Sequence, residues 1–122
     1  MVNRDKGPTN PLVASLIVEL RKASTNNQAA IWRTIFKILQ KPRRQRTEVN
    51  LSKINRYTKE NEQVIVPGKV LGTGELNHSV VVAAIAFSQS AKDKITAANG
   101  RAITISNLVE ENPKGSGIRI IR

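Results

Sequence analysis

The basic residues between positions 33 and 46 are the strongest chemical signal in the sequence. The window holds no acidic residue and six cations: Arg33, Lys37, Lys41, Arg43, Arg44 and Arg46. A solvated helix face usually alternates the signs of its charges, because unrelieved like charges repel one another. We therefore expect these cations to bind phosphate groups. Arginine suits RNA in particular, since its planar guanidinium can bridge phosphate oxygens and stack on exposed bases.

Two glycine-containing turns could also approach a phosphate chain. Gly68, Gly72 and Gly74 lie near Lys69, and they could form a backbone nest for phosphate or serve as turn glycines in a β-hairpin. This segment has neither the Gly-Lys-Ser/Thr of a Walker loop nor the third glycine of a dinucleotide fingerprint. The second turn, Lys114–Gly117, could bring its backbone close to a ribose-phosphate chain or could simply reverse the chain.

The residues that catalysis or metal binding would need are scarce. The sequence has no Cys, which excludes disulfides, thiolate metal sites and a cysteine nucleophile, and His78 is its only histidine. Glu75 precedes His78 by three residues, but no convincing nucleophile or second acid accompanies them, so we expect a structural or RNA-contacting role for His78. Trp32 is expected in the core, with base stacking as the alternative. No enzyme, cofactor or metal site is predicted.

Length and charge define the class of protein. The 122 residues have a formal net charge of +11, and 39% of them are hydrophobic, which suits one folded domain over residues 1–122. Residues 1–62 carry +8 of that charge and residues 63–122 carry +3. A positive field of this size attracts polyanions, of which nucleic acid is the commonest in the cytosol. A membrane surface is the weaker rival, because only 3% of the residues are aromatic and no apolar run could span a bilayer or serve as a secretion signal.

Two amphipathic helices are predicted at the start of the chain. Asn10 and Pro11 form a helix start, and apolar residues recur at helical spacing to about Ser24. A second helix, 28–40, places one apolar stripe opposite its cations, and the stripe comprises Ile31, Trp32, Ile35, Phe36 and Leu39. Packed together, the two helices form a hairpin with positive charge outward. Pro42 then ends the helix and begins an exposed basic loop, 41–46.

The rest of the chain alternates short strands and helices. We expect a brief helix at 52–57 and a β-hairpin with strands 64–66 and 69–71 joined by a Pro67-Gly68 turn. The apolar run 80–87 is continuous, which predicts a central strand covered on both faces. Further predictions are a helix at 90–98 closed by a left-handed Asn99-Gly100 cap, a strand at 102–105, a short helix capped by Asn107, and a final strand at 118–120. The fold class is therefore α/β, with a basic helical hairpin in front of a small strand-and-helix domain.

Several segments together resemble the large-subunit ribosomal protein family eighteen-e of archaea and eukaryotes. The matching segments cover nearly the whole chain, and they are Lys37–Arg46 followed by Val49–Ile54, the Asn10-Pro11 helix start, Val66–Gly72, and the run ending Ala84–Ser88. Thr47 departs from the pattern, where a smaller residue or proline is expected. The short length is similar to that of the archaeal members.

The resemblance implies a non-catalytic protein of the large ribosomal subunit with the irregular strand-strand-helix fold of ribosomal protein fifteen. Its implied partners are large-subunit ribosomal RNA and neighbouring ribosomal proteins, in the cytoplasm, with no small-molecule substrate. The predicted RNA-binding set is Arg33, Lys37, Lys41, Arg43, Arg44, Arg46, Lys53, Lys69 and Lys114. Two other classes remain as alternatives. A DNA-packaging protein would explain the charge but not the apolar second half, and a small RNA-processing enzyme would lack evident catalytic residues.

Overall fold

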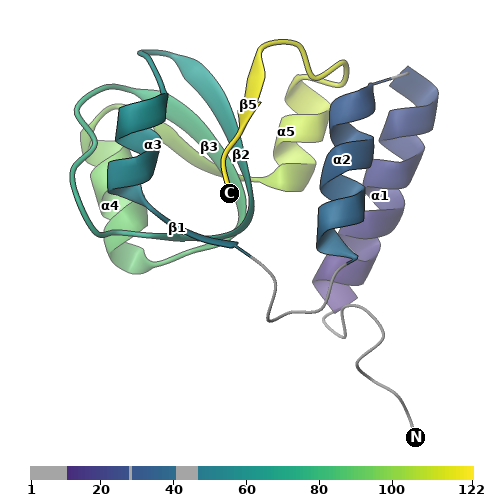
Figure 1. Ribbon diagram of the computed structural model, residues 1–122, viewed down its shortest axis with the longest axis horizontal. Helices are drawn as coiled ribbons and strands as arrows, with labels where there is room; N and C mark the ends of the chain where they lie inside the picture. Colours follow the sequence, from purple (N-terminus) through teal and green to yellow (C-terminus); the bar gives the residue numbers. More distant parts are fainter. Residues whose placement is uncertain (1–10, 28, 41–46) are drawn as a thin grey trace, which may run out of the picture.

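The protein is an α/β domain built on a parallel sheet (Figure 1), which confirms the expected class. The computed structural model describes residues 11–27, 29–40 and 47–122. Its strands are β1 (Thr47–Asn50), β2 (Glu62–Leu71), β3 (Val80–Phe87), β4 (Arg101–Thr104) and β5 (Ile118–Ile120). Its helices are α1 (Pro11–Asn27), α2 (Ala30–Leu39), α3 (Leu51–Tyr57), α4 (Gln89–Ala97) and α5 (Ile105–Glu111). The strand order is β1-β2-β3-β4, with β5 pairing with β2, and each of these pairs is parallel.

Helices cover both faces of the sheet. Figure 1 shows α3 and α4 on one side, and α5 followed by α2 and α1 on the other. Each side has its own apolar cluster: Leu20, Trp32 and Ile65 belong to the one under α1, α2 and α5. Ile54 and Ile95 belong to the one under α3 and α4. The basic hairpin is thus an outer layer on one face, as the sequence predicted.

Strand β3 is the central strand that its continuous apolar run predicted. Ala83 packs into the cluster beneath α1, α2 and α5, whereas Val82 and Ala84 pack into the opposite one. Successive residues of a strand point to opposite faces, so a strand with helices on both sides needs apolar residues at every position. Ile85 is only partly buried, which matters for the cost of truncating it.

The predicted hairpin at Pro67-Gly68 is wrong, because β2 continues through both residues. One edge of β2 pairs with β5 over Gln63–Ile65 and with β1 over Gly68–Leu71. On the other edge, the register with β3 shifts between Val66 and Lys69. Pro67 lies at that irregularity, where its missing N–H does not interrupt a regular ladder. The next strand is β3, which pairs with β2 in parallel after the helix-free connection 72–79 and continues into α4, a strand-strand-helix order.

Several helix ends also differ from the prediction. Helix α5 begins at Ile105 and not after Asn107, because the Thr104 hydroxyl accepts a 3.0 Å hydrogen bond from the Asn107 N–H and so caps the helix. The predicted strand therefore stops at Thr104. Helix α1 extends to Asn27, three residues past Ser24. The left-handed turn after α4 is confirmed, with a φ of 64° at Asn99.

Candidate RNA-binding surface

Helix α2 separates its apolar and cationic residues largely as its sequence predicted, except that Ile31 and Phe36 are only partly buried and Ile38 joins the buried side. Trp32, Ile35, Ile38 and Leu39 are buried, whereas Arg33 and Lys37 are exposed. Residues four apart on a helix lie one above the other, so the two cations form a short column on the outer face. The interior assignment of Trp32 is confirmed, since the side chain is 0% exposed and its indole Nε1–H donates a 2.6 Å hydrogen bond to the Pro113 carbonyl oxygen.

An open hollow of about 430 Å³ lies between the two helices of the hairpin. Its lining combines three cations, two hydroxyl side chains and one partly buried ring: Arg21, Arg33, Lys37, Ser24, Thr25 and Phe36. Arg21 comes from α1 and faces the α2 cations across the hollow. The sequence prediction missed Arg21, because it lies outside the dense window 33–46. The signal that could have found it is its place on the exposed face of an amphipathic helix packed antiparallel to α2.

No carboxylate neutralises this hollow among the residues that the structure describes. Their ion pairs are Arg101–Glu111 at 2.7 Å and Arg119–Glu62 at 3.4 Å, and both involve only residues outside the hairpin. The three cations therefore repel one another across the hollow in the free protein. An anion in the hollow would relieve that repulsion, which is the electrostatic condition for a phosphate site.

Four of the predicted RNA-binding residues, Lys41, Arg43, Arg44 and Arg46, lie outside the described residues. The nearest buried residues on either side are Leu39, with 0% exposure, and Val49, with 1%. The connection containing these four cations thus joins two anchored points, the end of α2 and the edge strand β1.

The remaining predicted residues are exposed or half-exposed but do not gather at the hairpin hollow. Lys53, on α3, donates a 2.6 Å hydrogen bond from Nζ to the main-chain oxygen of Arg122. Lys69 is exposed on β2, in register with Glu48 of β1. Lys114 is exposed in the connection between α5 and β5, next to the segment that packs on Trp32. The structure therefore brings together Arg33 and Lys37 and places the other three elsewhere.

The two glycine turns have packing roles in the structure. Gly74 has a φ of 93°, and an added Cβ would lie 2.5 Å from the Ser52 Cβ. The carbonyl oxygens of Gly72 and Gly74 accept hydrogen bonds from Lys94 Nζ at 2.7 and 2.8 Å, so they present oxygens and not N–H groups to the nearby charge. Gly115 has a φ of 71°, and its Cα packs against the Ile31 side chain. These contacts support packing roles for Gly74 and Gly115, whereas Gly68 lies within β2 and the hairpin expected around it does not form.

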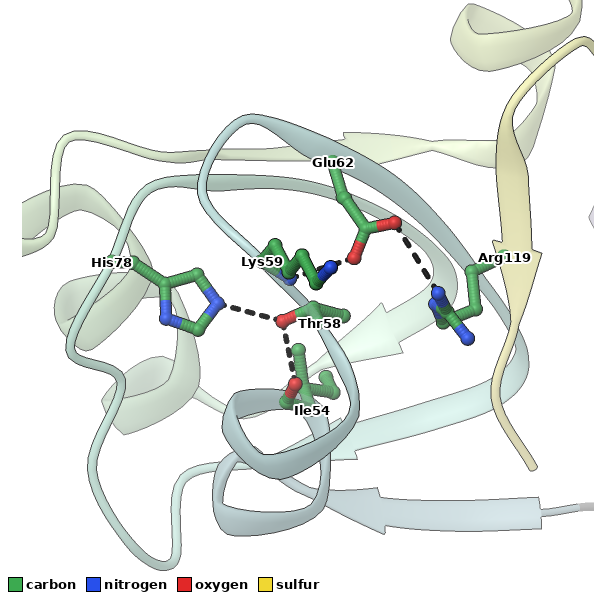
Figure 2. Close-up of polar contacts among 6 residues, drawn as sticks. All are labelled: Ile54, Thr58, Lys59, Glu62, His78 and Arg119. Carbon is green, nitrogen blue, oxygen red and sulfur yellow. Dashed lines mark hydrogen bonds and ion pairs between the residues drawn. The ribbon is translucent and has the colours of Figure 1, made fainter.

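His78 takes part in a short hydrogen-bonded chain (Figure 2). The Thr58 hydroxyl donates to the Ile54 carbonyl oxygen at 2.6 Å, and His78 Nε2 lies 2.7 Å from the same hydroxyl. Because the single hydroxyl proton goes to Ile54, His78 Nε2–H is the donor to Thr58. Thr58 is 8% exposed, so this bond satisfies a buried polar atom. A structural role for His78 follows, and within the described residues no group of three acidic or histidine side chains could hold a metal.

Glu62 connects two segments near the C-terminal strand, as Figure 2 shows. One carboxylate oxygen accepts the Lys59 N–H at 2.6 Å and the other contacts Arg119 at 3.4 Å. The hydrogen bond from the Lys59 N–H is the largest effect on the pKa of Glu62 and lowers it; burial opposes this shift, and the charge of Arg119 adds a smaller lowering. The pKa of Glu111 is lowered in the same way by hydrogen bonds from Arg101. These carboxylates are held ionised, as partners of cations and not as proton donors.

The sequence is similar to known proteins along nearly its whole length. The family model described as ribosomal protein 60S L18 and 50S L18e matches residues 2–122. The chain belongs to this family. It is 54% identical to large ribosomal subunit protein eL18 of Methanoregula boonei, over 93% of this chain and 94% of that one. It is 51% identical to the eL18 of Methanothermobacter thermautotrophicus, over 93% of each chain, and 49% identical to that of Halobacterium salinarum, over 93% and 97%.

Membership confirms the resemblance seen in the sequence motifs, including its archaeal character. The family consists of ribosomal proteins of the large subunit, which are structural components and not enzymes. The small RNA-processing enzyme is thereby excluded. Among the described helices, none is long and apolar enough to cross a membrane.

Proposed function

We propose that this protein is a cytoplasmic rRNA-binding constituent of the large ribosomal subunit, acting as one domain over residues 1–122. Its RNA contacts are the hairpin hollow and the basic segment 41–46. Cations there neutralise phosphates of RNA helices that pack closely, and neighbouring ribosomal proteins share the same RNA. The matching family and the printed names of the relatives support this assignment.

The single observation that carries the proposal is the convergence of Arg21, Arg33 and Lys37 on one hollow. The three cations come from two helices whose opposite faces are buried, so the core fixes the backbone positions from which the cations extend before RNA arrives. Phosphate binding then costs less conformational entropy, because no backbone has to be ordered. Binding also releases counterions from the RNA, which favours association at low salt.

The shape of the hollow favours folded RNA over a uniform duplex. It is concave, and the partly buried ring of Phe36 lies among its cations. A concave basic surface fits a protruding phosphate or a turn of the RNA backbone, and RNA is recognised largely through such irregular shapes. DNA packaging, the other nucleic-acid function considered, needs no such feature, because histone-type binding follows a smooth backbone.

Filter binding to a transcript of the archaeal large-subunit rRNA tests the proposal. The doubly substituted Arg33→Gln/Lys37→Gln and the triply substituted Arg43→Gln/Arg44→Gln/Arg46→Gln proteins should each bind more weakly than the unaltered protein. An excess of duplex DNA should compete poorly with the transcript. Equal competition by duplex DNA, or unchanged affinity in both variants, would contradict the proposal.

A further inference from the structure

A second basic hollow, of about 250 Å³, lies between α3 and the C-terminal strand. Lys53 and Tyr57 come from α3, and the other lining residues follow one another along the end of the chain: Arg119, Ile120, Ile121 and Arg122. Of the six lining residues, three are cations, one is an aromatic ring and two are aliphatic. The sequence prediction included only Lys53 of this group, because α3 and the C-terminal segment 119–122 are far apart along the chain and only the fold brings them together.

Tyr57 is the unusual member of this hollow. Its side chain is 52% exposed although the other face of α3 is fully buried, with Leu51 and Ile54 at 0% exposure. It is the last residue of α3, and the guanidinium carbon of Arg56 lies 5.4 Å from the centre of its ring. Arg56 covers one face of the ring, and an exposed aromatic ring offers its other face to a nucleic-acid base for stacking.

The cations beside Tyr57 are held in place but keep free hydrogen-bonding capacity. Lys53 Nζ donates to the main-chain oxygen of Arg122 at 2.6 Å, which links α3 to the C-terminal strand. An ammonium has three donors, so this bond leaves two for another acceptor. Arg119 contacts Glu62 through one terminal nitrogen at 3.4 Å, and its side chain is 48% exposed. Both side chains can therefore reach a phosphate without breaking the contacts that position them.

We propose that Tyr57 stacks on an unpaired RNA base while Lys53, Arg119 and Arg122 bind the flanking phosphates. This inference deepens the proposed function and rests on it for the class of partner. The residues of α3 pack into the cluster under α3 and α4, whereas the hairpin hollow belongs to the layer on the opposite sheet face. The protein thus has two RNA contacts on different sides, and it bridges two RNA segments.

Fluorine NMR on the full chain tests the stacking directly. The sequence has one Tyr and one Trp, so fluorotyrosine and fluorotryptophan each give a single resonance. A short single-stranded oligoadenylate should move the Tyr57 resonance upfield through the ring current of a stacked base. The resonance of buried Trp32 should stay in place, and an RNA duplex of equal length should not move Tyr57.

Substitution at the same position gives the second measurement. Tyr57→Leu should weaken oligoadenylate binding about fivefold or more, whereas Tyr57→Phe, which keeps the π-face, should bind nearly as the unaltered protein does. The Arg33→Gln/Lys37→Gln protein should still show the shift of the Tyr57 resonance at saturating oligoadenylate. This variant therefore distinguishes a failure of the hairpin hollow as an RNA site from a failure of the Tyr57 site. A Tyr57 resonance that does not move at saturating oligoadenylate, or full affinity in Tyr57→Leu, would overturn the inference.

Discussion

The indole Nε1–H of Trp32 donates a 2.6 Å hydrogen bond to the carbonyl oxygen of Pro113, a residue 81 positions further along the chain. This bond ties the inner face of α2 to the connection before β5. Gly115, in the same connection, packs against Ile31. The helix that presents Arg33 and Lys37 is therefore fixed to the C-terminal part of the domain and not only to α1.

We expect Trp32→Phe to destabilise the protein by about 1 to 3 kcal/mol, because the Pro113 carbonyl loses its donor and the smaller ring leaves a cavity at a residue with 0% exposure. Urea unfolding measures this, with Tyr57→Phe as the matched change at an exposed aromatic. RNA affinity measured well below the melting temperature should change little. Equal stability of the two variants would show that the hydrogen bond is not important.

A comparison of two isoleucines tests the burial of the sheet. Ile65→Ala should cost about 2 to 5 kcal/mol, because Ile65 is 0% exposed in the cluster beneath the hairpin. Ile85→Ala should cost clearly less, although the continuous run 80–87 alone would predict full burial for Ile85 as well. Denaturant unfolding of both variants measures which substitution costs more stability. A larger loss of stability for Ile85→Ala than for Ile65→Ala would contradict this assignment of the buried core.

The contact between His78 and Thr58 should be structural, with a coupling free energy of about 0.5 to 1.5 kcal/mol. A double-mutant cycle with Thr58→Val and His78→Ala measures that coupling through unfolding. His78→Gln can still donate to the Thr58 hydroxyl, so it should be milder than His78→Ala. Additive single effects, with no coupling, would contradict the hydrogen-bond assignment.

The lowered pKa of Glu62 predicts how the stability of the protein depends on pH. Its pKa is lowered below the ordinary 4.5 by the Lys59 N–H and by Arg119, so folding favours its ionised form. The stability that it contributes is present above pH 4.5 and is lost as the pH falls through the lower folded-state pKa. The gap in denaturation midpoint between the unaltered protein and Glu62→Gln should therefore narrow on acidification. A gap that is constant or widens would contradict the cause assigned to the shift.

The parts of the fold that follow from local pattern were predictable, and the parts set by strand pairing were not. Helical spacing located the apolar side of α2, and the unbroken apolar run 80–87 located β3, since both signals are local in the sequence. The Pro67-Gly68 turn was wrong because its local preference is overridden by pairing with β1, β3 and β5 along one long strand. Ile105 favours a strand by its β-branching, but the Thr104 cap starts α5 there.

The candidate site also contains residues that the sequence could predict and residues that it could not. Arg33 and Lys37 were found because they are close in sequence and on one helix face. Arg21 and the group around Tyr57 were missed, since only the packing of α1 on α2, and of α3 beside β5, brings their members together. Charge density along the chain detects a basic segment of sequence but not a basic hollow formed by residues that are distant in sequence.

The central claim, that phosphates bind at the hairpin hollow, is tested most directly by the salt dependence of rRNA binding in two matched variants. Lys37→Gln and Lys92→Gln each remove one exposed lysine from a helix, but only Lys37 lines the hollow, whereas Lys92 lies on α4. We predict that Lys37→Gln weakens binding, reduces the slope of log affinity against log salt by about 1, and leaves the melting temperature unchanged or raised, because repulsion in the free protein is relieved. Lys92→Gln should keep the original slope. Equal slopes for both variants, or unfolding of Lys37→Gln with full RNA affinity, would contradict this account.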